Sequence, residues 1–382
     1  MKVDIVVVAA GSGRRFGKDK IFFDLFGRPL VFYTLKNLFS AFEFERKILV
    51  LNPGKIEEGR KKLLPFFQDL IIVPGGKERT HSVLNGVKKT LSEYVLIHDG
   101  ARPFVPTDVV KRVIGSLKSH PAVTPAEPVR DTIKYYEGEF VFKTLDRSGL
   151  KSIQTPQGFE RKLILSALEY ALREGLVYTD ETTLVEEFGI KTKYVSGNPL
   201  NFKITYREDM EMAEKILSSN LRTGVGFDIH RFAEGRKMIL GGIEIPCEFG
   251  LAGHSDGDAL THAVIDALLG ATGISDIGEL FPDTDEKYRD VKSTDLLVQV
   301  VDLINSRGFF PVNVDAVVIT EKPKILQYRE RIVENLAGIL KIPTDRVSVK
   351  GKTAEKMGFV GRKEGLAVIA NALVVEVKNE NG

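Results

Sequence analysis

Over the first hundred residues, short runs rich in β-branched residues alternate with segments of helical periodicity. The runs are DIVVVAA, KILVLN, DLIIVPGG and YVLIHD, and helical patterns lie near residues 30–39 and 82–91. This alternation predicts right-handed βαβ units whose strands form a mostly parallel sheet, buried on both faces. We therefore expect the chain to begin with an α/β domain.

The pattern changes twice further along the chain. Residues 131–159 alternate polar and apolar side chains around a turn at Glu137 and Gly138, which predicts a protruding β-arm. From residue 222 onward we expect a smaller α+β domain, with a first strand at 224–230, a hairpin in MILGGIEIP, helices near 256–269, 294–307 and 328–340, and strands DAVVIT, RVSVK and EGLAVIANALVVEV. The expected domains are residues 1–220 and 221–382.

Composition agrees with two folded domains. A chain of 382 residues exceeds one comfortable hydrophobic core, and 43% hydrophobic with 28% charged residues is typical of globular proteins. The formal charge of +2 gives no reason to expect a nucleic-acid or membrane partner. Cys247 is the only cysteine, which excludes an intrachain disulfide. Because we find neither a signal-peptide pattern nor a spanning apolar run, we expect a cytoplasmic protein.

A glycine-rich loop, AAGSGRRFG, follows the first strand at residues 9–17. Backbone N–H groups in such a turn can bind phosphate, and Arg14, Arg15, Lys18 and Lys20 could neutralise a triphosphate. The spacing is neither that of the dinucleotide fingerprint nor that of the P-loop, so hydride transfer and Walker-type hydrolysis lose support. A solvated basic loop is the alternative interpretation.

Further ordered blocks strengthen the nucleotide interpretation: GKDKIFFDL, GGKERTHSV, IHDGARPF, PVRDTIK, TPQGF, TDE and NFKIT. With the glycine loop, they resemble the family of cytidylyltransferases that join CTP to 2-C-methyl-D-erythritol 4-phosphate. The resemblance covers the chain as far as residue 205 and implies a Rossmann-like nucleotidyltransferase domain. A nucleotidyltransferase for another sugar phosphate or nucleotide is the alternative, and TPQGF, DTIK and the arm argue against it.

The resemblance implies that Arg15 and Lys20 stabilise the transition state, because fixed cations act where negative charge builds on the α-phosphate. It implies that Asp99 helps to hold the nucleotide with Mg²⁺ or Mn²⁺, and that Arg147 and Lys203 grip the phosphate of the sugar. The whole implied substrate-binding set is Gly11, Gly13, Gly75, Gly76, Ser82, Asp99, Arg102, Asp131, Thr132, Arg147 and Lys203. Two departures from the family pattern are the short GKDK loop before Lys20 and the presence of His81 where aspartate is frequent.

Three of the six histidines, His230, His254 and His262, lie close together in the second domain. Strand alternation places Asp228 and His230 on one face. In the helix that we expect after them, His254, Asp258, His262 and Asp266 recur every four residues and should form one stripe. Two imidazoles with a carboxylate match a zinc site that keeps a fourth position open, whereas hydrogen-bonded structural histidines are the alternative.

At this point the chain resembles the 2-C-methyl-D-erythritol 2,4-cyclodiphosphate synthase family, through RTGVGFDIHRF, ILGGIEIP, GLAGHSDGDALTHAVIDALLGA, DIGELFPDTD, TEKPKI and KTAEKMGFVGRKEG. The resemblance implies that Asp228, His230 and His262 bind Zn²⁺ and that Glu355 binds a second divalent ion. It gives His254 and Thr353 catalytic contacts. The further implied substrate contacts are Ser255, Asp276, Ile277, Gly278, Phe281, Asp285, Lys352, Ala354, Glu355, Phe359 and Arg362, with Lys352 standing where threonine is common.

Together the two resemblances imply a bifunctional enzyme of isoprenoid-precursor synthesis that acts on small molecules. Relatives of the second domain form trimers with sites between subunits, and relatives of the first form dimers through the arm, so a trimer or hexamer is expected. A kinase must act between the two reactions, and whether it binds this chain stays open. The alternative is an active transferase fused to a zinc-stabilised module that only oligomerises.

Overall fold

The computed structural model describes residues 1–11, 16, 19–282, 284–288 and 291–377. The chain divides into two compact units, the first covering Met1–Met212 and the second beginning at Ala213. This division falls inside helix α7 (Arg207–Ser218), a few residues before the boundary expected at 220. Among the described residues, no helix combines the length and the apolar character that crossing a membrane requires.

The first unit is built on one mixed sheet whose strand order is β10-β7-β11-β6-β1-β4-β5, with β12 paired to β7. Its strands are β1 (Val3–Ala9), β4 (Lys47–Leu51), β5 (Leu70–Pro74), β6 (Tyr94–Asp99), β7 (Ala122–Pro128), β10 (Lys151–Ile153), β11 (Gln157–Glu160) and β12 (Lys193–Ser196). β6, β1, β4 and β5 run parallel, which confirms the predicted βαβ pattern, whereas β11 is antiparallel to β6 and β7. A short ribbon of β2 (Asp24–Leu25) and β3 (Arg28–Pro29) lies apart.

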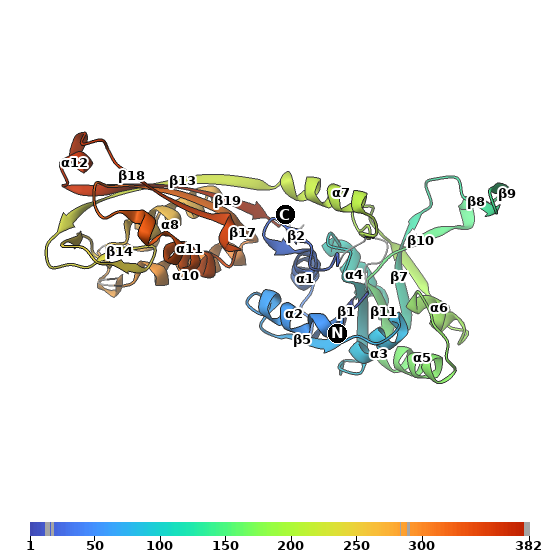
Figure 1. Ribbon diagram of the computed structural model, residues 1–382. Helices are drawn as coiled ribbons and strands as arrows, with labels where there is room; N and C mark the ends of the chain where they lie inside the picture. The colour runs from blue at the N-terminus through green and yellow to red at the C-terminus, as the bar shows by residue number, and fades with distance from the viewer. Residues whose placement is uncertain (12–15, 17–18, 283, 289–290, 378–382) are drawn as a thin grey trace. The chain divides into compact units, whose positions relative to one another are not determined.

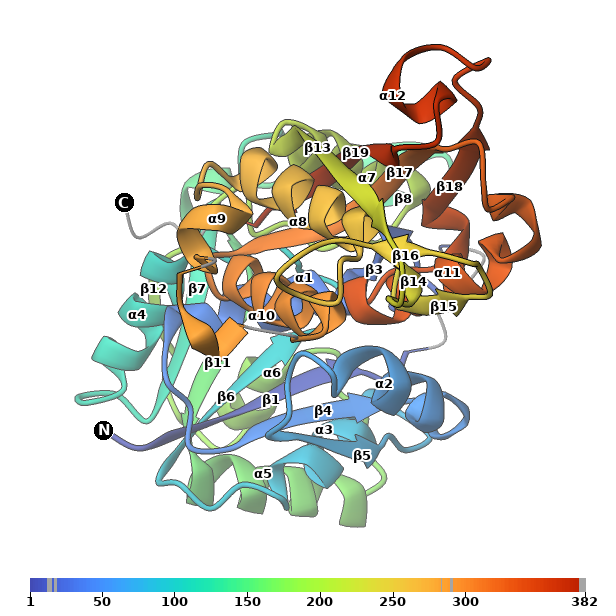
Figure 2. The same ribbon diagram turned by 90° about the vertical axis from the view of Figure 1, so that its left-hand side faces the viewer.

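Helices cover this sheet: α1 (Leu30–Ala41), α2 (Ile56–Leu63), α3 (Arg79–Val87), α4 (Thr107–Ser116), α5 (Arg161–Arg173) and α6 (Glu181–Glu186). β1 is buried along its whole length because apolar side chains point to both faces. One face packs on α3 and α5, where Val6, Val83 and Ile164 share a core, and α1 and α4 contact each other on the other side (Figure 2).

Residues 134–144 form a hairpin of β8 (Lys134–Glu137) and β9 (Phe140–Thr144), separate from the main sheet (Figure 1). Its apolar side chains are exposed, with Phe140 at 80% and Tyr136 at 71%. The arm expected over 131–159 is shorter in the structure, because β10 and β11 pair within the main sheet. Phe159 of β11 is fully buried there, so apolar burial accounts for the difference.

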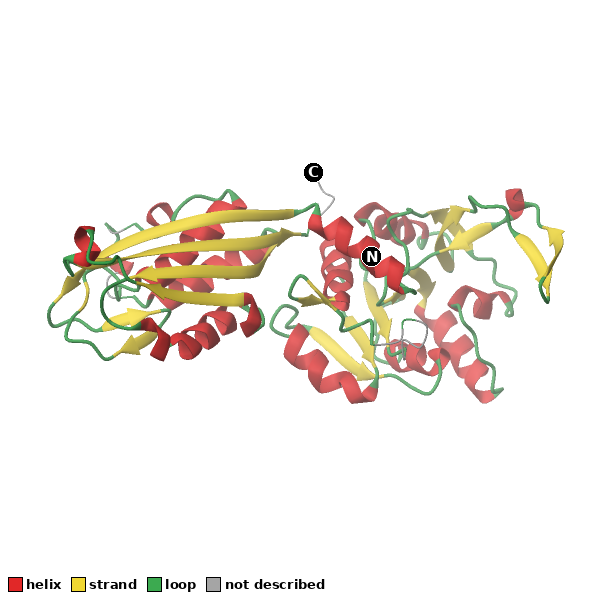
Figure 3. Ribbon diagram, turned by 45° about the horizontal axis from the view of Figure 1, so that its top comes forward, coloured by secondary structure: helices red, strands yellow, loops and turns green. Residues whose placement is uncertain are grey.

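The second unit is a five-stranded sheet with helices on one face (Figures 1 and 3). The strand order is β16-β13-β19-β17-β18, with β13 (Leu221–Ala233), β16 (Gly250–Leu251), β17 (Phe309–Ile319), β18 (Val347–Lys352) and β19 (Gly365–Glu376). The helices are α8 (Ala259–Thr272), α9 (Ile277–Leu280), α10 (Ser293–Ser306), α11 (Arg329–Leu340) and α12 (Gly358–Gly361). The hairpin expected in MILGGIEIP is present as β14 (Met238–Leu240) and β15 (Ile243–Ile245).

The expectation of a four-residue stripe on one helix is wrong in part. Helix α8 begins at Ala259, so His254 lies in the preceding loop and Asp258 is the N-cap. Asp258 is fully buried and accepts four hydrogen bonds, from the backbone N–H groups of Gly241, Gly242 and Thr261 and from the Thr261 hydroxyl. Aspartate favours this cap position because its side chain satisfies amides that the helix leaves unpaired. Only His262 and Asp266 of the expected stripe are helical.

Two glycines let β13 lie directly against α8. A Cβ on Gly226 would come 1.9 Å from the Ala263 carbonyl oxygen, and one on Gly224 would come 2.2 Å from the Ala267 carbonyl oxygen. Both obstacles are helix backbone, which cannot rotate away as a side chain can. The strand and the helix can therefore hold this spacing only while these two positions lack a side chain.

We predict that Gly226→Ala destabilises the second unit by about 3 kcal/mol, because the new Cβ must push the strand from the helix. Hydrogen exchange of β13 and α8 amides measures this locally. Gly270→Ala in α8 is the matched control, since its Cβ would meet only ordinary contacts at 3.9 Å or more. The control should be neutral or stabilising by about 1 kcal/mol, as expected for Gly→Ala in a helix. Unchanged protection in Gly226→Ala would contradict this account of the interface.

Candidate functional sites

The first unit contains a cleft of about 560 Å³ where β1 and β6 end. Ligands of open α/β sheets commonly bind at the carboxyl ends of parallel strands. The lining residues include six that the sequence analysis selected, namely Gly11, Lys20, Gly76, Ser82, Asp99 and Lys203, together with Lys77, Glu78 and Arg79. The structure thus brings these expected residues together.

The loop after β5 is held tightly against the loop after β1. A Cβ on Gly75 would lie 2.3 Å from the Ala10 Cβ, and one on Gly76 would lie 2.4 Å from the His81 Cβ. Ser82 at the start of α3 accepts a hydrogen bond from the Gly76 N–H at 3.1 Å. The two glycines are therefore required by close packing, and His81 forms one wall of the loop.

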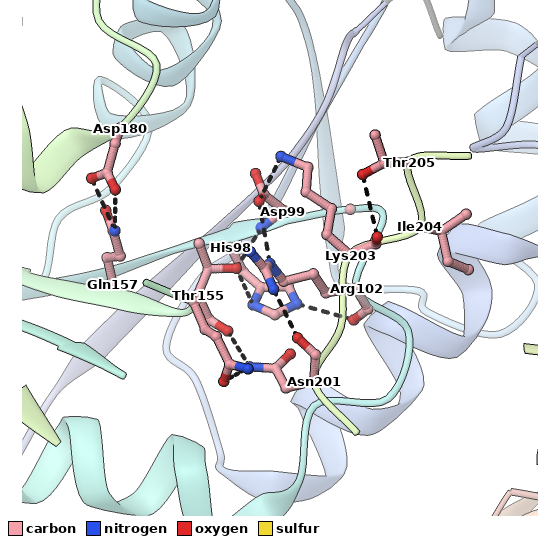
Figure 4. Close-up of polar contacts among 12 residues, drawn as sticks. His98, Asp99, Arg102, Thr155, Gln157, Asp180, Asn201, Lys203, Ile204 and Thr205 are labelled. Atoms are coloured by element: carbon pink, nitrogen blue, oxygen red, sulfur yellow. Dashed lines mark hydrogen bonds and ion pairs between the residues drawn. The ribbon is translucent and has the colours of Figure 1, made fainter. Parts of the chain in front are cut away.

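Asp99 lies at the end of β6, is 5% exposed, and contacts three cationic side chains. Arg79 donates to its Oδ1 at 2.8 Å. Lys203 and Arg102 approach its Oδ2 at 2.9 and 3.4 Å (Figure 4). Arg79 also donates two hydrogen bonds to the buried carboxylate of Glu181, at 3.1 and 2.9 Å. Three cationic side chains surround the single negative charge of Asp99, so positive charge remains in the cleft. This excess positive charge favours an anionic ligand.

The pKa values follow from this arrangement. Burial acts to raise the pKa of Asp99, but Arg79, Lys203 and Arg102 together hold it well below its usual range. Burial also acts to lower the pKa of Arg79, but Glu181 and Asp99 outweigh it and raise that pKa. Glu181 has a raised pKa, since its burial exceeds what its one partner Arg79 restores. Asp99 is therefore the fixed negative charge of the cleft.

A buried histidine supports the backbone beside Asp99. His98 Nε2 lies 3.2 Å from the Arg102 carbonyl oxygen, which only accepts, so Nε2 carries the proton. Its Nδ1 lies 3.1 Å from the Thr155 hydroxyl and therefore accepts, while Thr155 Oγ1 in turn accepts from the Asp99 N–H (Figure 4). Asn201 donates to the Thr155 carbonyl oxygen at 2.7 Å. These bonds connect TPQGF and NFKIT to the end of β6.

The NFKIT segment also positions two cations. Lys20 donates from Nζ to the Ile204 carbonyl oxygen at 2.6 Å, and Arg102 donates to the Asn201 carbonyl oxygen at 2.7 Å. Lys203 of the same segment lines the cleft, and the hydrogen bonds to the carbonyl oxygens of Asn201 and Ile204 fix the backbone on either side of it (Figure 4). Lys20 therefore lies at the cleft despite the shortened loop before it.

Other expected residues either lie outside the described residues or do not line this cleft. Gly13 and Arg15 lie outside the described residues. Asp131, Thr132 and Arg147 are exposed on the segments that flank the β8–β9 hairpin, and none of these three lines the cleft. Arg147 donates to the Arg130 carbonyl oxygen at 2.5 Å. Their place in a substrate site stays a prediction.

The sequence analysis missed Arg79 and Glu181 as site residues. Both lie within blocks that carried the family resemblance, GGKERTHSV and TDE, so the signal was present. Their pairing joins positions 79 and 181, and no local pattern indicates a contact over that separation. Asp180, the residue before Glu181, accepts from the Gln157 amide nitrogen with each of its two carboxylate oxygens at 3.0 Å, and it caps α6 (Figure 4).

Burial lowers the pKa of His98 from 6.5 to about 4, which predicts a pH-dependent stability. Between these values His98 binds a proton in the unfolded chain but not in the folded chain. Its contribution to the free energy of unfolding is therefore fully present above pH 6.5 and is lost as the pH falls toward 4. The expected loss is on the order of 3 kcal/mol. Urea unfolding followed by circular dichroism should show a smaller loss in His98→Gln. An unaltered slope in His98→Gln would contradict the assignment.

The second unit brings Asp228, His230 and His262 together, each offering one ligand atom within 4.8 Å of the others. Asp228 and His230 come from β13 and His262 from α8. Asp228 Oδ2 lies 3.1 Å from Nδ1 of each histidine. Although Asp228 is near, His230 Nδ1 is buried and makes no hydrogen bond within the described chain. Two histidines hold the pKa of Asp228 below its ordinary value despite burial, which by itself would raise it.

This triad opens into a cavity of about 530 Å³ that is lined by six further residues expected to contact the substrate. They are His254, Ser255, Ile277, Gly278, Phe281 and Asp285. Asp276 caps α9 through the Glu279 N–H at 2.9 Å and does not line the cavity. One turn beyond His262, Asp266 accepts from the Ile277 N–H at 2.8 Å. Helix α8 therefore positions both a candidate ligand and the loop that faces it.

The expected substrate contacts in the segment from Lys352 to Arg362 do not line the cavity of the triad. Lys352 and Thr353 line a different cavity of about 490 Å³, beside β18. Thr353 donates to Glu355 at 2.5 Å, and Arg362 pairs with Glu364 at 2.7 Å. Glu355 and Arg362 are exposed and Phe359 is partly buried, and none of the three lines either of these two cavities. Ala354 donates its N–H to Glu321 at 3.2 Å. Within the described part of one chain, the residues expected at the second site are thus divided between the cavity of the triad and the region around Lys352 and Thr353.

Comparison with known proteins agrees with both halves. Residues 3–219 match the family model of 2-C-methyl-D-erythritol 4-phosphate cytidylyltransferase, and residues 221–375 match the YgbB family. The chain is 40% identical to "Bifunctional enzyme IspD/IspF" of Desulforudis audaxviator over 96% of this chain and 95% of that one. It is 39% identical to the protein of that name from Granulibacter bethesdensis, over 98% and 99%. The solved 4-diphosphocytidyl-2C-methyl-D-erythritolsynthase from Anaerococcus prevotii is 32% identical, with a TM-score of 0.51, over 57% of this chain and 96% of that one.

Proposed function

The chain belongs to the family of bifunctional IspD/IspF enzymes, and we propose that the Asp99 cleft and the Asp228, His230, His262 site carry its two activities. It is a cytidylyltransferase and a cyclodiphosphate synthase of isoprenoid-precursor synthesis. The first reaction transfers CMP from CTP to 2-C-methyl-D-erythritol 4-phosphate and releases pyrophosphate. The second cyclises 4-CDP-2-C-methyl-D-erythritol 2-phosphate and releases CMP.

For the first reaction, the cleft residues bind and orient phosphates. Gly11 and Gly76 present backbone to the nucleotide, and Lys20 is held at the cleft by the Ile204 carbonyl oxygen. Attack of the sugar phosphate on the α-phosphorus increases negative charge on its oxygens, which Lys20 would stabilise together with Arg15. Lys203 would bind the phosphate of the sugar. No protein nucleophile is needed.

A divalent ion fits the first site in a restricted way. Asp99 offers a carboxylate, but its Oδ2 is engaged by Lys203 at 2.9 Å, so that cation must move before the oxygen can bind a metal. Lys203 is partly exposed, whereas Arg79 is fixed by Glu181, so Lys203 is the one free to turn. Mg²⁺ or Mn²⁺ held by Asp99 and the nucleotide phosphates would neutralise the developing charge.

Zinc fits the second site. Three donors of the right types lie within 4.8 Å, one ring nitrogen is buried without a hydrogen bond, and the cavity leaves a fourth side open. Zn²⁺ held there would act as a Lewis acid on the β-phosphate. His254 and Ser255 would bind the attacking phosphate, and Thr353 would contact the transition state from the cytidine side. This convergence of Asp228 with two histidines is the observation that carries the proposal.

The two separate cavities of the second unit support an assembly in which neighbouring subunits complete one site. We propose that the cavity of the triad in one subunit meets Lys352, Thr353 and Glu355 of another, as expected for a trimer. Glu355 would then hold a second divalent ion near the diphosphate. The exposed apolar hairpin, including Tyr136 and Phe140, supports pairing of the first unit and hence a hexamer. The single cysteine supports a reducing cytoplasm.

Both reactions can be measured on the full chain. Incubation with CTP, methylerythritol phosphate and Mg²⁺ should release pyrophosphate. Incubation with the phosphorylated CDP-methylerythritol should release CMP and the cyclic diphosphate. Pyrophosphate without CMP, in a protein that binds zinc, would leave the second unit as an oligomerisation module and contradict the second half of the proposal.

Single substitutions should separate the two activities. We predict that Lys203→Met lowers pyrophosphate release by about 100-fold, because a cation that acts on phosphate is lost, while CMP release is kept. His262→Ala should abolish zinc binding and CMP release and keep pyrophosphate release. Lys193→Met on the exposed strand β12 is a matched control and should leave both rates unchanged. Loss of both activities in either of the first two variants would contradict the assignment of one site to each unit.

A further inference from the structure

The two ring nitrogens of His262 face different partners. Nδ1 lies 3.1 Å from Asp228 Oδ2, on the side where the three candidate ligands converge. Nε2 lies 2.9 Å from the Ser293 hydroxyl and 3.1 Å from the Ser255 hydroxyl. Only one ring nitrogen can present a lone pair to a metal, so the hydroxyl side decides the tautomer.

The Ser293 hydroxyl has a single proton, which it donates in a hydrogen bond to the Asp256 carboxylate. The Ser293 hydroxyl lies 2.5 Å from Asp256 Oδ1, and the Ser293 N–H donates to Asp256 Oδ2 at 3.2 Å. An ionised carboxylate accepts only, so the hydroxyl must donate to it. Ser293 Oγ then has lone pairs, and no proton, to offer to His262. Ser255, the second hydroxyl near Nε2, also lies 3.3 Å from Ser293 Oγ and can direct its own proton to that oxygen. In this arrangement the ring donates from Nε2 to the nearer Ser293 oxygen at 2.9 Å, which leaves the Nδ1 lone pair directed at Asp228 and His230.

The location of these groups favours a fixed network. Ser293 is fully buried at the first position of α10 and Ser255 is 8% exposed, so water competes little for their hydrogen bonds. Asp256 is additionally fixed by the Asp258 N–H, which donates to its Oδ1 at 3.3 Å. The sequence analysis gave none of these roles to Asp256 or Ser293, and it used Ser255 only as a substrate contact.

We propose that Asp256 and Ser293 are positioning residues of the metal site, which orient His262 by accepting its Nε2–H and so present Nδ1 to the ion. This inference rests on the proposed zinc site of the second unit. Carboxylates or hydroxyls behind a ligating histidine typically fix its tautomer and orientation and contribute about 10–100-fold to metal affinity. Here the carboxylate acts through an intervening hydroxyl.

The test measures zinc affinity of the full-length protein by competition with a chromophoric chelator. Ser293→Ala should weaken zinc binding by about 10–100-fold, and Asp256→Asn should weaken it in the same direction. Ser293→Thr, which keeps the hydroxyl, should retain most of the affinity. Ser306→Ala is the matched control on the same helix, because its exposed hydroxyl donates to the Leu303 carbonyl oxygen, away from Ser293 and Asp256. It should bind zinc as the wild type does.

A second measurement distinguishes positioning from a general loss of structure. The protein loaded with Co²⁺ absorbs visible light according to the geometry of its ligands. The spectrum should change in Ser293→Ala and stay the same in Ser306→Ala. Far-ultraviolet circular dichroism should be unchanged in both variants. If Ser293→Ala does not fold, the affinities of Asp256→Asn and Ser293→Thr decide the question.

The outcomes separate this inference from the proposed function. A wild-type protein that binds no zinc overturns both. If the wild type binds zinc and His262→Ala does not, while Ser293→Ala and Asp256→Asn bind within twofold of the wild type with an unchanged cobalt spectrum, only the positioning role is overturned. Weaker binding in Ser255→Ala alone would assign the role to the other hydroxyl and reject Ser293.

Discussion

The close approach of β13 to α8 is the constraint on which the second site depends. Because Gly224 and Gly226 have no side chain, the strand lies against the helix backbone, at a spacing that a Cβ would violate by more than an ångström. Farther along the same strand, Asp228 and His230 thereby come within ligand distance of His262. A metal site made of three side chains on two elements needs such a fixed separation, since metal–ligand distances tolerate little variation.

In the first unit, the organising interaction is the buried charge of Asp99. A carboxylate at the end of a buried strand is costly unless cations compensate it, and Arg79, Arg102 and Lys203 do so from three separate segments. The same contacts gather cations around the cleft in which we propose that the nucleotide binds. Structural compensation and the proposed ligand binding therefore use one set of side chains. Lys203 is the most exposed of the three, so it is the one that we expect to exchange Asp99 for a ligand.

Whether a feature could be predicted from the sequence depended on how far apart in the sequence the interacting residues lie. Strands with β-branched runs, the hairpin in MILGGIEIP and the pairing of Asp228 with His230 on one face are local properties, and the structure confirms them. The placement of His254 on a helix was wrong because Asp258 is the N-cap of α8, and its side chain is held there by the backbone of the turn between β14 and β15. Arg79, Glu181 and Ser293 were missed because the contacts of Arg79 with Glu181 and of Ser293 with Asp256 join residues that are distant in sequence.

By itself, the sequence determined the parallel βαβ pattern, the β14–β15 hairpin and the family of each half. It also predicted the chemistry of each half: glycine loops with cations for phosphate, and histidines with carboxylates for a metal. These follow from side-chain periodicity and residue type, which are read along the chain. Only the tertiary structure decided which cations neutralise Asp99, which nitrogen of His262 faces the other ligands, and that Lys352 and Thr353 line a cavity apart from the triad. Those outcomes depend on distances and directions between segments that are far apart in the sequence and meet only in the folded chain. No local sequence pattern therefore encodes them.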